Sequence, residues 1–230
     1  MRHAMVLFAA ISVLVPATVR AGEATNGTPV AFKASDDTEL TGILYGKGTT
    51  ALVLCHGRAY TKGAASFADE ARWLASKGLM VLALNFRGYP ADDPTDTFEG
   101  QELDVAAAFD HVAKLGAKRI YLLGSSMGGF AALKALPALD TKPQYAGIIV
   151  LSAFARLVAG DEPGRKLFVV ARNDWQFYPK TMVTLIRIGA PKQAIVFKKG
   201  GHGQQLFKSH RKELLEAIRL FVTTGDEASK

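Results

Sequence analysis

The sequence predicts an α/β protein, built on one mostly parallel sheet with helices on both of its faces. From residue 50 onward, short apolar runs alternate with amphipathic segments, which is the order that parallel strands and their crossover helices produce. Most of these runs are continuously apolar, as expected for strands that are covered on both faces. The chain has 230 residues, 49% of them hydrophobic and 21% charged, so it is long enough for one large core.

Eight extended segments are expected along the chain. The first two are joined by Ser35-Asp36-Asp37-Thr38, a connection short enough for an antiparallel hairpin. The later segments are separated by helical patterns and are therefore expected to be parallel strands. The eight segments cover residues 29–34, 39–45, 51–55, 80–84, 120–123, 147–152, 167–171 and 194–197.

Three amphipathic segments are predicted to form helices. Phe67, Ala71 and Leu74 recur at helical spacing, and Gly78 behind them is typical of a helix end. Apolar residues repeat in the same way over residues 105–112 and 214–221. Because no internal repeat or long linker interrupts the pattern, we expect a single domain.

The first 21 residues have the layout of a secretory signal peptide. A basic start at Arg2 and His3 is followed by an almost wholly apolar run at residues 4–15. That run is shorter than the roughly 20 residues that a membrane-spanning helix needs, so cleavage is expected and an uncleaved anchor is the alternative. The protein is then periplasmic or secreted, with no stable membrane span after cleavage. The expected organisation is a signal peptide at 1–21, a domain at 22–224 and a polar tail at 225–230.

The charge and the cysteine content narrow the class of protein. The net charge of +7 falls to +5 without residues 1–21, because that segment holds two arginines and no acid. A positive balance permits a nucleic-acid or anionic-membrane partner, but no basic and aromatic motif of a nucleic-acid-binding fold accompanies it. We therefore expect no nucleic-acid partner. The single cysteine, Cys55, excludes an intramolecular disulfide framework and a cysteine-based zinc site.

A glycine-rich turn joins a predicted strand to a helix expected over residues 130–136. It reads Gly124-Ser125-Ser126-Met127-Gly128-Gly129 and contains the pattern G-x-S-x-G, in which a nucleophilic serine lies on a tight turn between small neighbours. Centring the pattern on Ser126 places glycines on both sides, whereas centring it on Ser125 places leucine and methionine there. Ser126 is therefore the predicted nucleophile.

Other interpretations of this turn have less support. A phosphate-binding loop would need G-K-[ST], and the glycine spacing differs from the dinucleotide pattern G-x-G-x-x-G. A glycine-rich structural turn without catalysis remains the alternative.

A serine nucleophile needs a base, and His202 is the predicted one. It lies in a glycine-rich loop at residues 199–203, just after the last predicted strand, and the C-terminal ends of parallel strands are where ligand-facing residues gather. His3 leaves with the signal peptide, and His111 falls within a helical stripe. His210 lies in the basic opening of the last helix, where we expect it to be solvated.

Asp174 is the predicted acid that orients the base. It follows the strand at 167–171, and the order Ser126, Asp174, His202 matches the nucleophile, acid, base order known for this kind of site. Asp161 and Glu162 lie in the preceding loop and are the rivals. A turn formed by Asn173 and Asp174 is the purely structural alternative.

Two backbone N–H groups are expected to bind the oxyanion. One belongs to Met127, the residue after the nucleophile. The other is expected from the loop after the strand at 51–55, where Arg58 is favoured over Gly57. His56 would then orient this loop, and Cys55 would pack as a small hydrophobic side chain.

Together these segments resemble the α/β-hydrolase superfamily. The resemblance implies an eight-stranded, mostly parallel sheet and a Ser-Asp-His hydrolase without cofactor or metal. It also implies a structural role for Arg87. The matching stretches, in family order over residues 52–203, are LVLCHGRA, VLALNFRGYP, IYLLGSSMGGFAAL, KLFVVARNDW and VFKKGGHG.

The short connection at residues 153–165 leaves no room for a separate lid domain. The chain is similar to the small, lidless dienelactone-hydrolase and thioesterase-like group, but it has Ser126 where those dienelactone hydrolases use cysteine. We therefore expect hydrolysis of a small-molecule carboxylic ester or thioester through an acyl-enzyme. An acyltransferase, a peptidase and a non-catalytic binding protein on the same scaffold remain alternatives. Asp92, Asp93 and Asp96 are expected to form a solvated loop.

Overall fold

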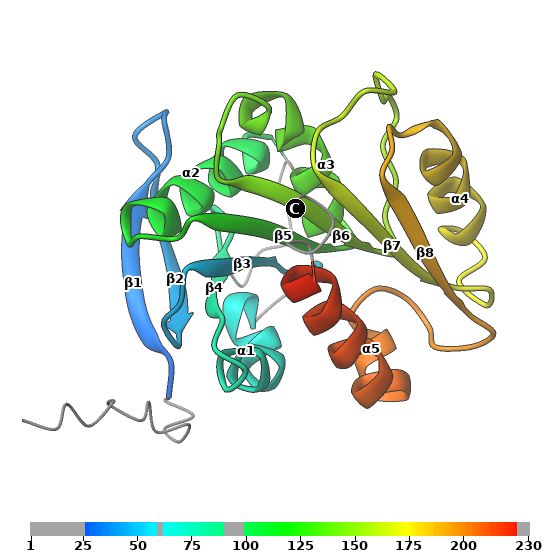
Figure 1. The fold of residues 1–230 in the computed structure, drawn as a ribbon, viewed down its shortest axis with the longest axis horizontal. Helices are drawn as coiled ribbons and strands as arrows, with labels where there is room; N and C mark the ends of the chain where they lie inside the picture. Colours follow the sequence, from blue (N-terminus) through cyan, green and yellow to red (C-terminus); the bar gives the residue numbers. More distant parts are fainter. Residues whose placement is uncertain (1–25, 59–61, 90–98, 225–230) are drawn as a thin grey trace, which may run out of the picture.

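A computed structural model describes residues 26–58, 62–89 and 99–224. The predicted signal peptide at 1–21, the polar tail at 225–230 and the acidic loop with Asp92, Asp93 and Asp96 lie outside these ranges. The described residues fold around one eight-stranded sheet with helices on both faces (Figure 1).

The sheet has the strand order β1-β2-β4-β3-β5-β6-β7-β8. The predicted hairpin is confirmed, because β1 and β2 pair antiparallel, and β2 also runs antiparallel to β4. All pairs from β4 to β8 are parallel, as predicted. The strands are β1 (Thr28–Lys33), β2 (Glu39–Tyr45), β3 (Thr50–Cys55), β4 (Met80–Asn85), β5 (Arg119–Ser125), β6 (Tyr145–Leu151), β7 (Arg165–Ala171) and β8 (Lys192–Phe197).

The helices divide into two layers, one on each face of the sheet (Figure 1). One layer holds the short 3-10 helix η1 with α1 and α5, and the other holds α2, α3 and α4. The bounds are η1 (Gly63–Phe67), α1 (Ala68–Ala75), α2 (Gln101–Lys114), α3 (Met127–Leu139), α4 (Tyr178–Arg187) and α5 (Gln205–Thr223).

The central strand β3 shows why the strands are continuously apolar. Val53 and Cys55 pack in the core on the α2 and α3 side, whereas Leu52 and Leu54 pack on the α1 and α5 side. Successive side chains of a strand point to opposite faces, and here both faces are covered, so every position from Ala51 to Cys55 is buried. The α/β fold class is thus confirmed.

Helix α4 was not among the predicted helices, and its buried positions explain why. Thr181 and Thr184 are buried where apolar residues would mark a helix face. The Thr181 hydroxyl donates to the carbonyl oxygen of Ala153 at 3.0 Å, and Thr184 Oγ1 accepts from the N–H of Ala155 at 3.0 Å. Hydrogen bonds therefore anchor this helix where the sequence pattern would show hydrophobic residues.

The last helix begins earlier than its apolar stripe, and His210 marks a break inside it. The backbone of His210 is non-helical, with φ of −134°. Its ring stacks on Phe197 with 3.8 Å between centroids, and Nε2 donates to the carbonyl oxygen of Lys199 at 2.6 Å. The expectation of a solvated His210 was therefore wrong, because a strand-end aromatic ring and a loop carbonyl hold it.

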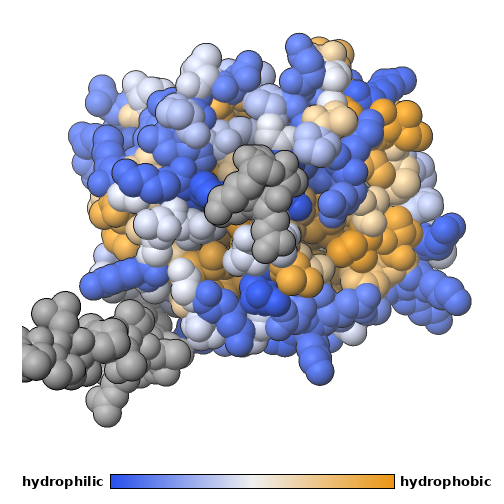
Figure 2. Space-filling view, in the orientation of Figure 1, coloured by the Kyte–Doolittle hydropathy of each residue, from blue (hydrophilic) through white to orange (hydrophobic). Residues whose placement is uncertain are grey.

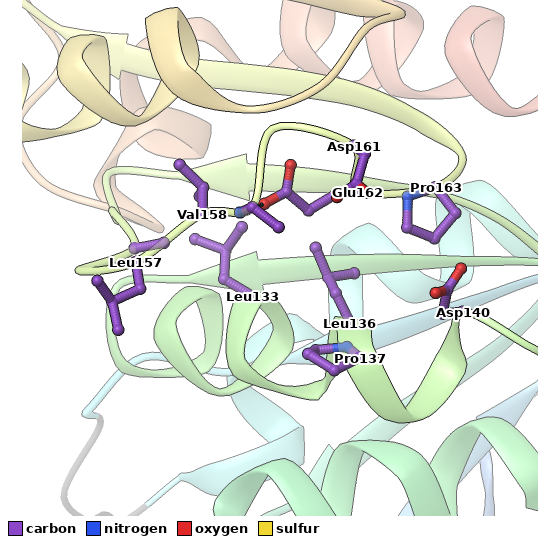
Figure 3. A pocket seen from close by; sticks show the side chains of 11 residues that line it. Leu133, Leu136, Pro137, Asp140, Leu157, Val158, Asp161, Glu162 and Pro163 are labelled. Atoms are coloured by element: carbon purple, nitrogen blue, oxygen red, sulfur yellow. Dashed lines mark hydrogen bonds between the residues drawn. The ribbon is translucent and has the colours of Figure 1, made fainter.

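The connection from β6 to β7 contains no helix or strand over residues 152–164, all of which are described. It runs beside α3, and together they enclose a groove of about 390 Å³ (Figure 3). Leu133 and Leu136 of α3 face Val158 of the connection across this groove. Within the described ranges, no helix is both long and apolar enough to cross a bilayer.

Candidate active site

The turn between β5 and α3 holds Ser126 in an unusual backbone conformation. Ser126 has φ of 49° and ψ of −114°, and α3 begins at the next residue. A Cβ at Gly124 would overlap the backbone of Gly128, and a Cβ at Gly128 would overlap the carbonyl group of Cys55. The two glycines that identified Ser126 in the sequence are thus required by contacts within the turn and with β3.

Ser126, His202 and Asp174 lie together at the C-terminal ends of three parallel strands. His202 Nε2 is 2.6 Å from the Ser126 hydroxyl oxygen, and His202 Nδ1 is 2.8 Å from Asp174 Oδ2. The Asp174 carboxylate accepts a hydrogen bond from His202 Nδ1, so Nδ1 carries the ring proton. Nε2 is then free to accept a hydrogen bond from the serine hydroxyl. The three residues follow β5, β7 and β8, which explains why residues far apart in sequence meet at one edge.

Side chains on both sides fix the loop that carries His202. Asn173 Oδ1 accepts from the N–H groups of Gly200 and Gly201 at 3.1 and 3.4 Å. Gln205 Oε1 accepts from the N–H of His202 at 3.0 Å. These roles were not predicted, because isolated polar residues in loops follow no periodic pattern.

The loop after β3, which includes Gly57, is tied to the histidine loop by Gln204. The N–H of Gly57 donates to Gln204 Oε1 at 3.0 Å, and Gln204 Nε2 donates to the Ser66 hydroxyl at 3.0 Å. The hydrogen bond to Gln204 occupies the N–H of Gly57, which was the less favoured candidate for the second oxyanion donor. The N–H groups of Met127, at the start of α3, and of Arg58 stay predictions for that role.

The buried ring of His56 also binds the loop after β3. Its ring is fully buried, Nδ1 donates to the carbonyl oxygen of Gly57 at 2.7 Å, and Nε2 accepts from the N–H of Phe86 at a long 3.5 Å. Burial lowers the pKa of His56 to about 4, so the ring is neutral at pH 7. A neutral ring with both nitrogens engaged in the protein fits the predicted orienting function.

Arg87 forms ion pairs with two carboxylates. Its guanidinium binds Asp104 of α2 at 2.7 and 2.9 Å and Asp36 of the β1–β2 hairpin at 2.8 Å. The arginine therefore joins α2 to the hairpin, which is a structural role of the kind that the resemblance implied. The hydrogen bonding of Arg87 to Asp36 lowers the pKa of this carboxyl group to about 2.

Three phenylalanine rings form an apolar wall beside His202. Phe177 lies 4.1 Å from the His202 ring, centroid to centroid. Phe130 of α3 contacts Phe154 at 4.8 Å in a T-shaped pair, and both lie within 6.3 Å of Phe177. Each ring is partly exposed, so an apolar group of a substrate can lie against this wall. Among the described residues, no three His, Cys, Asp or Glu side chains are placed to hold a metal ion.

The strand order and the serine on a strained strand-to-helix turn define a protein of the α/β-hydrolase class. The chain belongs to the family described as serine aminopeptidase, S33, whose pattern matches residues 46–205. It is therefore a serine hydrolase. A comparison with curated proteins by sequence gave no match.

Solved structures with the same fold share little sequence identity with this chain. A dienelactone hydrolase from Anabaena variabilis has a TM-score of 0.70 at 15% identity, covering 85% of this chain and 95% of its own. An esterase from Exiguobacterium antarcticum has a TM-score of 0.67 at 16% identity, covering 84% and 98%. XC6422 from Xanthomonas campestris, described as a serine hydrolase without a lid, has a TM-score of 0.66 at 18% identity, and the match covers 86% of this chain and 94% of its own. The predicted resemblance to small lidless hydrolases is confirmed.

Proposed function

We propose that the protein is an exported esterase that cleaves small-molecule carboxylic esters or thioesters through a Ser126-Asp174-His202 triad. The observation that carries the proposal is the unbroken chain of hydrogen bonds from the Ser126 hydroxyl through His202 to the buried Asp174. Such a chain lets the histidine accept the serine proton while the carboxylate stabilises the resulting imidazolium.

The reaction begins when His202 Nε2 takes the hydroxyl proton and Ser126 Oγ attacks the acyl carbonyl carbon. The N–H groups of Met127 and Arg58 stabilise the negative oxygen of the tetrahedral intermediate. His202 then gives its proton to the leaving alcohol or thiol, which leaves an acyl group on Ser126. A water molecule, deprotonated by the same histidine, hydrolyses the acyl-enzyme and restores the serine.

Esters are favoured over peptides by the wall of Phe130, Phe154 and Phe177 beside the histidine, which suits an apolar acyl or alcohol group. Peptide cleavage is the second candidate, because the family description names an aminopeptidase. A panel of p-nitrophenyl esters, acyl thioesters and aminoacyl p-nitroanilides separates the two. Faster cleavage of the anilides than of the esters would reverse the preference, and transfer to an added alcohol would identify an acyltransferase.

Substitution of Ser126 tests the mechanism. Ser126→Ala is expected to lower kcat on p-nitrophenyl butyrate at least about 1000-fold and to abolish labelling by a fluorophosphonate probe. Ser125→Ala is the matched control, because this buried neighbour has no hydrogen-bond partner for its hydroxyl among the described residues. Undiminished turnover in the Ser126 variant, or loss of activity only in the control, would contradict the assignment. An unlabelled but folded wild-type protein would indicate a binding protein.

Export is supported by the basic start and apolar run of residues 1–21. Export and cleavage are measured by expressing the full chain in a bacterium, fractionating the cells and sequencing the N-terminus of the product. We expect a periplasmic or secreted product that begins near Gly22. A cytoplasmic product that keeps Met1 would contradict export.

A further inference from the structure

The outer face of α4 is apolar and basic. Val183 and Ile186 lie three residues apart and are 45% and 73% exposed, so they form one outward stripe. Lys180 and Arg187 are exposed beside that stripe. Thr181 and Thr184 form the opposite, buried side of the helix. The helix therefore presents hydrophobic side chains to solvent although its inner side is already packed.

The connection after β6 continues this surface. The N–H of Ala155 donates to Thr184 Oγ1 at 3.0 Å, so the residues that follow leave from the buried side of α4 and continue along the groove beside α3. They include Arg156, which is exposed, and Leu157, which is 92% exposed. Lys180 Nζ lies 5.0 Å from the ring of Phe154, on the same side. We name the surface of Arg156, Leu157, Lys180, Val183, Ile186 and Arg187 the α4 face.

The α4 face adjoins the proposed catalytic residues. Trp175 directly follows Asp174 and is 82% exposed. Phe154, under Lys180, belongs to the phenylalanine wall that reaches His202 through Phe177. Figure 2 shows apolar side chains gathered on the side of the molecule where Figure 1 places α4. The exposed apolar surface thus extends from the helix toward the site.

Charges near the helix are mainly positive. Asp161 and Glu162 of the connection lie at the C-terminal end of α4, where Glu162 Oε2 accepts from the N–H of Gly189 at 3.0 Å. Lys192 Nζ donates to carbonyl oxygens of the same helix end. Residues 175–191 contain no Asp or Glu, whereas Lys180 and Arg187 contribute positive charge from α4 and Arg156 from the connection. Apolar side chains flanked by lysine and arginine are the combination with which a surface helix enters the headgroup region of an anionic bilayer. A second copy of this chain would instead bring identical positive charges together, which opposes self-association.

We propose that the α4 face docks on an anionic lipid bilayer. Val183, Ile186 and Leu157 enter the headgroup boundary, while Lys180, Arg187 and Arg156 contact lipid phosphates. Docking brings the opening beside Trp175 and the phenylalanine wall toward the membrane surface. If the proposed esterase function also holds, esters dissolved in the bilayer reach Ser126 along this apolar path.

Vesicle binding tests the docking apart from catalysis. The Ser126→Ala chain without residues 1–21 is sedimented with vesicles of phosphatidylcholine alone or with 30% phosphatidylglycerol. We expect binding to the anionic vesicles that weakens in high salt. Lys180→Glu with Arg187→Glu should weaken it on the order of fivefold or more per charge. Val183→Ser with Ile186→Ser should weaken it several-fold.

Leu220→Ser with Lys212→Glu is the matched control on α5, which covers the opposite face of the sheet. Leu220 is 46% exposed, similar to Val183, so the control changes comparable surface. Equal binding to both vesicle types, no binding to either, or equal loss in the control variant would overturn the proposal. A concentration-dependent dimer that the α4 variants dissociate would assign the face to a second copy instead. Because the test uses an inactive variant, failure of the esterase assignment does not affect its outcome.

Discussion

In the turn that carries Ser126, neighbouring backbone fixes the geometry, whereas the loop that carries His202 is held by side chains. Gly124 and Gly128 leave no room for a Cβ, so the turn is determined by contacts within it and with β3. Around His202, Asn173 and Gln205 bind loop N–H groups, and Gln204 reaches across to Gly57. The first arrangement tolerates no change, while the second distributes the restraint over several hydrogen bonds of modest strength.

The largest effect is expected in the turn. Gly128→Ala places a Cβ against the carbonyl groups of Cys55 and His56, which cannot move without shifting the central strand. We expect a loss of about 4 kcal/mol in unfolding free energy, measured by urea denaturation, and loss of esterase activity. Gly116→Ala is the control, since nothing lies within 4 Å of its added Cβ and only the left-handed backbone costs about 1 kcal/mol. Equal losses in both variants would show that the turn is not sterically fixed.

The second effect concerns His56, which links the loop after β3 to Phe86, the residue that follows β4. Its pKa falls from 6.5 to about 4 in the folded protein, so the unfolded chain binds a proton at higher pH than the folded one. The contribution of the neutral His56 to the free energy of unfolding is therefore fully present above pH 6.5. It declines by about 3 kcal/mol as the pH falls from 6.5 to 4. Urea denaturation at several pH values measures the decline. In His56→Gln the slope over this range should flatten, and an unchanged slope would assign the decline to other groups.

The smallest effect is expected in the side-chain network of the histidine loop. Gln204→Met removes the acceptor for the N–H of Gly57 but keeps the length of the side chain. We expect kcat on p-nitrophenyl butyrate to fall about 10- to 100-fold, with KM changed less than about twofold, because oxyanion geometry matters only in the transition state.

Two further variants sharpen this prediction. Gln204→Glu keeps an oxygen toward Gly57 and should recover part of kcat, whereas a purely structural role would not favour it over methionine. Gln193→Met, on the exposed edge strand β8, is the control and should behave as wild type. A change confined to KM would place Gln204 in substrate binding and not in positioning.

The same contrast explains what could be predicted from the sequence. Ser126 and its fold context were predictable because sterics require glycines at fixed spacing, and the buried strands because both faces are covered. Helix α4 was not, because threonine hydrogen bonds replace apolar burial at Thr181 and Thr184. Gln204 was not predictable either, because its partner Gly57 is 147 residues away and no local pattern records that contact.

The position of β8 at the edge of the sheet has a consequence for protein synthesis. Ser126 follows the central strand β5, whereas His202 follows β8, the last strand along the described chain. A growing chain therefore contains the serine turn well before His202, the proposed base, has been made, since synthesis runs from the N-terminus. Nascent or C-terminally truncated chains would carry the proposed nucleophile without its proposed base, so the proposed hydrolysis would begin only once His202 has been made and the chain has folded.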